Sequence, residues 1–202
     1  MLSMQLPGAD FIAEMRALQD VYLTGEDPMA QSGFSGGRER WVAERSPIID
    51  ALHRDGDLLD VGCANGLLVE DVTSWAAEKG HTIVPHGVDI GPDLVALARR
   101  RLPRFAANFH AFDAWDWEPG RTWDYVYSLE DLAPGDLRCE WIRRLAGWVT
   151  PGGRLIIGSY GSSSRAIDPV DVRAWLEQCG LELAGTATGG EPPVSNFAWA
   201  NV

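Results

Sequence analysis

The stretch LLDVGCANGLLVEDV, residues 58–72, decides the fold. Two apolar runs flank a turn that reads Gly-Cys-Ala-Asn-Gly at residues 62–66. The first run predicts a short buried strand, and the second predicts a helix that ends before Gly80. A glycine-rich turn between a strand and a helix lets a ligand approach the backbone closely, so the turn predicts a binding site.

From this unit onward, predicted strands and helices alternate along the chain. The expected strands cover residues 58–61, 86–90, 108–112, 123–128, 154–159, 181–188 and 196–201. The expected helices cover residues 67–79, 92–102 and 136–148, and a last one begins at Asp168-Pro169 and ends at Gly180. Such alternation predicts an α/β fold, a three-layer sandwich around a mostly parallel seven-stranded sheet. A hairpin across residues 189–195 makes a C-terminal strand antiparallel.

The first 54 residues predict a helical cap that precedes this α/β core. Apolar residues recur at helical spacing between Asp10 and Leu23. Residues 24–40 are rich in Gly, Ser and Pro and indicate a long loop that can serve as a lid. Helical pattern resumes near Arg38, and Ser46-Pro47 offers an N-cap for a further segment. We expect one domain over residues 1–202, with residues 1–54 as its cap and 55–202 as its core.

Composition narrows the class of protein. The chain has 202 residues, of which 46% are hydrophobic and 23% charged, as in a soluble domain. A net charge of -12 opposes nucleic-acid binding. Neither a membrane-spanning run nor an export signal is evident, so we expect a cytoplasmic protein. The three cysteines, Cys63, Cys139 and Cys179, lack metal-site spacing, and we expect reduced thiols and no metal.

The glycine spacing separates the possible ligands of the turn. A dinucleotide fingerprint, G-x-G-x-x-G, requires glycines where Ala64 and Leu67 stand, which weakens a dehydrogenase interpretation. A phosphate-binding Walker loop requires a lysine after its last glycine, but the only lysine of the chain is Lys79. The turn therefore predicts neither a nucleotide triphosphatase nor a typical dinucleotide enzyme.

The pattern from Asp60 to Gly66, acidic-hydrophobic-Gly-x-small-x-Gly, resembles that of class I S-adenosylmethionine-dependent methyltransferases. Ordered landmarks of that family continue from Asp57 to the C-terminus, and Ala64 departs from the commoner glycine. The resemblance implies a Rossmann-like fold with S-adenosylmethionine as cofactor. The residues implied to bind it are Asp60, Gly62, Cys63, Ala64, Gly66, Asp89, Ile90, Asp113, Ala114, Ser128 and Leu129.

Two of these residues have specific implied roles. Asp89, after the second strand, stands where the family binds the ribose, because a carboxylate accepts hydrogen bonds from both hydroxyls. Asp113, after the third strand, stands where the family binds the adenine amino group, although Asp116 is close enough to compete. Asp60 has a structural alternative, which is to fix the turn through backbone hydrogen bonds.

The acceptor side is less well marked. Glu130 and Asp131 follow the fourth strand, where methyl group and acceptor should meet, so we predict a base or an anchor for a cationic acceptor. Arg38 and Arg40 are candidates to reach the cofactor carboxylate. The residues expected to line the acceptor pocket are Tyr22, Phe34, Trp41 and Tyr160.

The leading hypothesis is methyl transfer to a nitrogen or oxygen atom of a small molecule, by a monomer or homodimer without membrane or nucleic-acid partners. No large insertion follows the fourth or fifth strand, which leaves no room for a separate substrate domain. One alternative is a macromolecule methyltransferase that uses the arginines of residues 99–104 to hold RNA or protein. Another is a module that binds the cofactor without catalysis.

Overall fold

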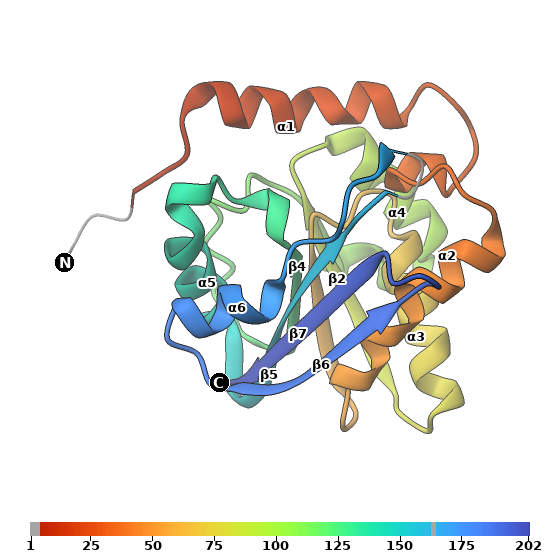
Figure 1. Cartoon of the computed structure of the whole chain (residues 1–202). Coiled ribbons are helices and arrows are strands. Elements are labelled where there is room, and N and C mark those ends of the chain that lie inside the picture. The colour runs from red at the N-terminus through yellow and green to blue at the C-terminus, as the bar shows by residue number, and fades with distance from the viewer. Residues whose placement is uncertain (1–4, 163–164) are drawn as a thin grey trace.

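The computed structural model describes residues 5–162 and 165–202, which form one seven-stranded sheet in the order β3-β2-β1-β4-β5-β7-β6 (Figure 1). All neighbouring strands are parallel except β7, which is antiparallel to both β5 and β6. The predicted fold class is confirmed. The strands are β1 (Gly56–Val61), β2 (Ile83–Asp89), β3 (Phe109–Ala111), β4 (Trp123–Leu129), β5 (Val149–Tyr160), β6 (Leu183–Gly189) and β7 (Ser195–Asn201).

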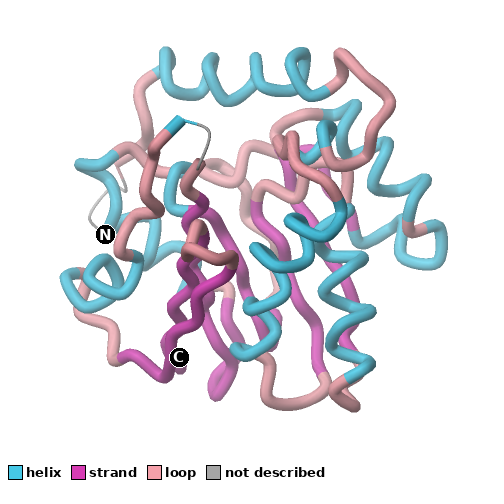
Figure 2. Tube along the Cα trace, turned by 45° about the vertical axis from the view of Figure 1, so that its right-hand side comes forward, coloured by secondary structure: helices cyan, strands magenta, loops and turns pink. Residues whose placement is uncertain are grey.

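Helices cover both faces of the sheet, each with its own apolar core. On one face pack α2 (Arg38–Arg45), α3 (Leu67–Glu78) and α4 (Pro92–Arg101), which bury Trp41, Val72 and Val95. On the other pack α5 (Arg138–Ala146) and α6 (Val172–Gln178), with Trp141 and Trp175. The first helix, α1 (Ala9–Tyr22), lies across the top of the molecule, above the ends of the strands (Figures 1 and 2).

The glycine turn after β1 owes its shape to positive backbone angles. Gly62 has φ 83° and Gly66 φ 76°, a region that residues with a Cβ atom adopt at a cost. A Cβ at Gly66 would stand 2.9 Å from the Cβ of Ala98, so this glycine also lets the start of α3 approach α4. Ala64 adopts φ 44° in the same turn, and its small side chain is buried.

Several predicted element boundaries differ from those in the structure, and three of them are instructive. The strand expected at residues 154–159 starts at Val149, so Pro151, Gly152 and Gly153 lie inside β5. A register shift against β4 absorbs the extra residues. The last helix starts at Val172 instead of Pro169, because Asp171 is its N-cap and its carboxylate accepts a hydrogen bond from the amide of Ala174 (3.2 Å). The segment that begins at Ser46 is a 3-10 helix without a side-chain cap (Ser46–Ala51).

The prediction of three reduced thiols is also wrong. Cys139 at the start of α5 and Cys179 at the end of α6 form a disulfide, and only Cys63 is a free, buried thiol. Their Cα atoms are 5.0 Å apart, within the usual range for a disulfide, because the two helices pack side by side. A separation of 40 residues hides this neighbourhood in the sequence.

Candidate active site

A pocket lies between α1 and the carboxyl ends of β1, β2 and β4, the edge where open α/β sheets bind ligands. One face of α1 forms the roof with Phe11, Ile12, Met15, Leu18, Gln19 and Tyr22. Of the predicted cofactor residues, those that line the pocket are Gly62, Ala64, Asp89, Ile90, Asp113, Ala114 and Leu129. The structure therefore brings together residues from four separate segments of the core under the first helix.

Asp89 connects two turns at the end of β2. Its Oδ2 accepts a hydrogen bond from the amide of Ala64 in the glycine turn, and its Oδ1 accepts from the amide of Gly91, both at 2.8 Å. Burial raises the pKa of Asp89, while the two amide donors oppose that shift. Each oxygen keeps a second lone pair for a ligand. This arrangement suits the paired hydroxyls of a ribose.

Asp113 begins the next wall of the pocket. Its Oδ1 accepts from the amide of Trp115 at 3.0 Å, and Trp115 stacks on Trp141 with ring centroids 4.6 Å apart. The indole N–H of Trp115 donates to the carbonyl of Leu132 (3.0 Å), which holds this aromatic wall in place. Asp116 is exposed and lies outside the lining residues. The geometry favours Asp113 over Asp116 for contact with a nucleobase.

Four predicted cofactor residues lie outside the pocket lining: Asp60, Cys63, Gly66 and Ser128. Ser128 is buried and accepts a hydrogen bond from the Trp141 indole at 3.2 Å, so it supports the pocket wall. Burial raises the pKa of the Cys63 thiol well above its usual value, which keeps it protonated and unreactive. Asp60 is buried beneath the turn, where burial and the charge of Asp89 raise its pKa to about 7.

The two predicted acceptor-side carboxylates have different surroundings. Asp131 lines the pocket, and desolvation there raises its pKa. Glu130 is not among the lining residues, and it accepts a hydrogen bond from Ser159 Oγ at 3.0 Å. Burial raises the pKa of Glu130 despite that bond. Tyr22 of α1 shares the pocket with Asp131; burial and then the charges of Asp131 and Asp89 raise the pKa of its phenol.

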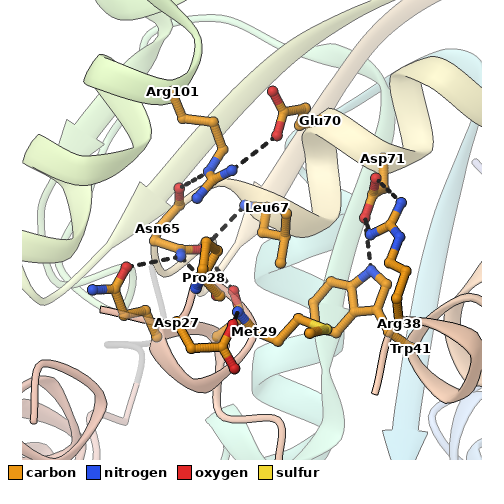
Figure 3. A network of polar contacts seen from close by, with 12 residues as sticks. Asp27, Pro28, Met29, Arg38, Trp41, Asn65, Leu67, Glu70, Asp71 and Arg101 are labelled. Carbon is orange, nitrogen blue, oxygen red and sulfur yellow. Dashed lines mark hydrogen bonds and ion pairs between the residues drawn. The ribbon is translucent and has the colours of Figure 1, made fainter. Parts of the chain in front are cut away.

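Of the residues predicted to bind the acceptor, only Tyr22 lines the pocket, whereas Phe34, Trp41 and Tyr160 surround the side chain of Arg45. The expectation that Arg38 and Arg40 reach the cofactor is not met. Both terminal nitrogens of Arg38 donate to the Asp71 carboxylate, at 2.5 and 2.6 Å. Asp71 also accepts a hydrogen bond from the Trp41 indole at 2.7 Å (Figure 3). Arg40 is paired with Glu44 at 2.8 Å.

Asn65, in the middle of the glycine turn, is a structural residue that the sequence did not reveal. Its fully buried amide donates to the carbonyl of Pro28 (2.8 Å) and accepts from Ser32 Oγ (2.6 Å) and the amide of Leu67 (3.2 Å) (Figure 3). The carbonyl of Asn65 accepts from Arg101 on α4. Asn65 thus ties the loop after α1 to the turn that borders the pocket. An asparagine between an alanine and a glycine was the only signal, and it indicates just a turn.

This strand order, with a glycine turn after the first strand and a buried carboxylate after the second, defines a class I methyltransferase domain. Residues 35–186 match the family described as Methyltransferase domain, and the chain belongs to that family, whose methyl donor is S-adenosylmethionine. The residues present fit a nucleoside, because Asp89 presents two acceptor oxygens beside a turn whose glycines leave room for a ligand.

Two curated proteins share part of the chain's sequence. Trans-aconitate 2-methyltransferase of Methylobacterium radiotolerans is 30% identical over 131 residues, which are 65% of this chain and 48% of that protein. The biotin biosynthesis bifunctional protein BioCD of Bordetella avium is 27% identical over 159 residues, 77% of this chain and 31% of that protein. The chain therefore spans less than half the length of either relative.

Solved structures share the fold at low sequence identity. N-methyltransferase NodS from Bradyrhizobium japonicum, in complex with S-adenosylhomocysteine, has a TM-score of 0.68 at 17% identity, with 93% of this chain and 97% of that chain covered. Magnesium protoporphyrin IX methyltransferase from Synechocystis, with bound S-adenosylmethionine, has a TM-score of 0.65 at 18% identity, with 98% and 99% covered. The [4+2]-cyclase SpnF also has the fold, with a TM-score of 0.56 at 13% identity over 78% and 79% of the two chains. Fold alone therefore does not select the reaction.

Proposed function

We propose that this protein transfers the methyl group of S-adenosylmethionine to a nitrogen or oxygen atom of a small molecule. The observation that carries the proposal is the carboxylate of Asp89, fixed by two amides at 2.8 Å at the wall of the family's cofactor pocket. The roof of that pocket is α1 itself, without an interposed domain, which favours a compact acceptor.

When bound, the cofactor supplies a methyl group on a positively charged sulfur, which becomes a neutral thioether after transfer. The protein's own tasks are to align the acceptor and to exclude water. The apolar face of α1 excludes water. Asp131 aligns the acceptor, because it is the lining carboxylate that is not needed to bind the ribose or the adenine. Its raised pKa makes it a better proton acceptor at neutral pH, and it removes the proton that an amine or hydroxyl acceptor must lose.

The charges of the pocket favour a neutral or cationic acceptor. Among the described lining residues are three carboxylates, Asp89, Asp113 and Asp131, and no arginine, lysine or histidine. A polycarboxylate would meet unpaired negative charge in such a pocket, which disfavours its binding. We therefore expect an amine or a phenol in preference to an acid such as the one that names the trans-aconitate relative.

The macromolecule alternative is less well supported. Two arginines of the basic stretch 99–104 serve the fold, because Arg99 donates to the carbonyl of Phe109 (2.6 Å) and Arg101 pairs with Glu70 (3.1 Å). The net charge of -12 further disfavours nucleic acid.

None of the helices in the described part of the chain has the length and apolar character that a membrane span requires. Cytoplasmic location and a monomeric or homodimeric state stay predictions.

The test is a methyl transfer assay with labelled S-adenosylmethionine and a panel of amines, phenols and carboxylic acids. We expect a methylated amine or phenol, and a drop of about 10² to 10⁴ in kcat for Asp131→Asn. The control is Asp116→Asn, which removes an exposed carboxylate outside the pocket and should keep full activity. Full activity of Asp131→Asn would assign the role of base to Glu130. If none of the amines and phenols in the panel is methylated, the proposed substrate class is wrong.

A further inference from the structure

Tyr22, the last residue of α1, lines the pocket with a hydroxyl that has no hydrogen-bond partner among the described residues. Burial raises the pKa of this phenol most, and the charges of Asp131 and then Asp89 raise it further. Carboxylates that follow two different strands therefore act on one hydroxyl. Because a phenol can donate one hydrogen bond and accept others, this group is available to a ligand that lies near both carboxylates.

The ring of Tyr22 packs directly against the backbone of Gly33, in the loop that follows α1. Gly33 has φ 72°, and a Cβ atom there would stand 2.6 Å from the hydroxyl oxygen of Tyr22 and 2.9 Å from the ring carbon that carries it. Any other residue at this position would displace the phenol and would also strain the backbone. The place of the hydroxyl in the pocket therefore depends on where Gly33 lies.

Asn65 of the glycine turn holds the loop that carries Gly33. Its side-chain amide donates to the carbonyl of Pro28 (2.8 Å) and accepts from Oγ of Ser32 (2.6 Å), the residue before Gly33 (Figure 3). Within the described residues, every hydrogen bond between the loop 24–33 and the α/β core ends at this side chain. Asn65 is therefore the polar anchor of the loop.

The hydroxyl of Tyr22 lies where the methyl group and its acceptor should meet. In S-adenosylmethionine a single carbon atom joins the sulfur to the ribose ring, so the methyl group lies close to the carboxylate that binds the ribose. That carboxylate is Asp89, and Asp131 is the proposed base on the acceptor side. A hydroxyl on which both carboxylates act is thus placed beside the reacting atoms.

We propose that the Tyr22 hydroxyl binds the acceptor atom beside the methyl group, and that Asn65, through Gly33, is the residue that positions this hydroxyl. The inference rests on the proposed function and names a specificity-determining contact for it. The phenol oxygen accepts a hydrogen bond from an amine acceptor, or the hydroxyl donates one to the oxygen of a phenol acceptor. The acceptor's lone pair then forms the bond to the methyl carbon, the electron pair of the broken bond stays on sulfur, and the acceptor's proton passes to Asp131.

The test is calorimetric titration of the full chain with two ligands that differ at the methyl position. S-adenosylhomocysteine has nothing there, whereas in sinefungin a carbon atom that bears an ammonium group replaces the methylated sulfur. The ratio of their two affinities therefore reports the contacts at this position without any acceptor. For Tyr22→Phe we expect sinefungin to bind about 5- to 20-fold more weakly, with S-adenosylhomocysteine changed by less than about twofold.

Two variants test the positioning. Gly33→Ala and Asn65→Ala should each weaken sinefungin relative to S-adenosylhomocysteine by about three- to tenfold, because they displace the Tyr22 hydroxyl. In the Tyr22→Phe background, Gly33→Ala should change the ratio by less than about twofold, since it acts through that hydroxyl.

The matched control is Asn108→Ala. It removes a hydrogen bond of the same kind, from a side-chain amide to the carbonyl of Pro85 (3.0 Å), at a residue outside the pocket lining. It should leave the ratio of the two affinities unchanged, and a change as large as that of Asn65→Ala would contradict the role of Asn65.

Three results would overturn the inference in different parts. Equal weakening of both ligands by Tyr22→Phe would show that the hydroxyl binds the cofactor and not the acceptor. An unchanged ratio in Gly33→Ala would show that the loop does not position Tyr22, and this variant decides the point alone if Asn65→Ala binds neither ligand. A wild type that binds neither ligand would instead overturn the proposed cofactor. Because the titrations contain no acceptor, failure to find a methylated product does not affect them.

Discussion

The two helices that precede the core, α1 and α2, differ in how they are held. No residue of α1 is fully buried, and Leu18 on its pocket face is 38% exposed. α2 buries Trp41, Glu44 and Arg45, and Trp41 is 1% exposed and bonded to Asp71 on α3. Segments with few buried contacts open locally at low cost, whereas buried segments open with the whole domain. The comparison shows that α2 is part of the buried core, and we predict that α1, with no buried residue, acts as a lid.

The contact that holds α1 over the pocket is also small. Gln19 accepts from the amide of Asp93 at the start of α4 (2.9 Å) and donates to its carboxylate (3.4 Å). The apolar face of α1 is half-buried over the pocket, and it gains further burial when the pocket is filled. A ligand should therefore stabilise the closed position of α1 more than it stabilises α2.

The largest effect that tests this contrast is expected for Trp41→Ala. It leaves a large cavity next to Arg45 and removes the indole hydrogen bond to Asp71, which keeps its ion pair with Arg38. We expect about 3–5 kcal/mol less stability in urea or guanidinium unfolding. The matched control on α1 is Leu18→Ala, which should change the free energy of unfolding by less than about 0.5 kcal/mol. Similar losses for the two variants would contradict the division between core and lid.

A smaller effect is expected from Asp60→Asn, as a function of pH. In the folded protein the pKa of Asp60 is raised to about 7, above its unfolded value near 3.8, so the folded state holds this proton more tightly. The stability that this provides is fully present below about pH 4 and is lost as pH rises through 7. The wild type should therefore lose up to about 4 kcal/mol relative to Asp60→Asn between pH 4 and 8. The measurement is the free energy of unfolding of both proteins across that pH range. Parallel pH profiles would show that folding does not raise the pKa of Asp60.

The smallest effect is expected from Gln19→Ala, which releases α1 from α4. Global stability should change by less than about 1 kcal/mol, while amide hydrogen exchange in α1 should become about fivefold faster. Mass spectrometry of exchange resolves α1 from α2, and Arg16→Ala, at an exposed position of α1, is the control. Added S-adenosylhomocysteine should slow exchange in α1 of the wild type. Exchange in α1 that ignores both the variant and the ligand would show that the helix is not a lid.

Local sequence patterns were sufficient for the α/β order, the glycine turn and the positions of Asp89 and Asp113, because each depends on residues close in the chain. Patterns could not place Arg38, which was a candidate for the ligand and instead pairs with Asp71, 33 residues away. Nor could they reveal Arg45, because a charged residue in a polar helix segment normally faces solvent. The catalytic role of Asp131 stays a prediction that the assay decides.

By itself the sequence determined which segments form strands and helices and which turn comes close to a ligand, since alternating apolar runs, proline, glycine and capping residues act over a few positions. Only the tertiary structure decided which carboxylate lines the pocket, which cysteines meet and which arginine lies among aromatic rings. Those outcomes depend on how helices pack across the sheet, where side chains distant in sequence compete for the same buried space.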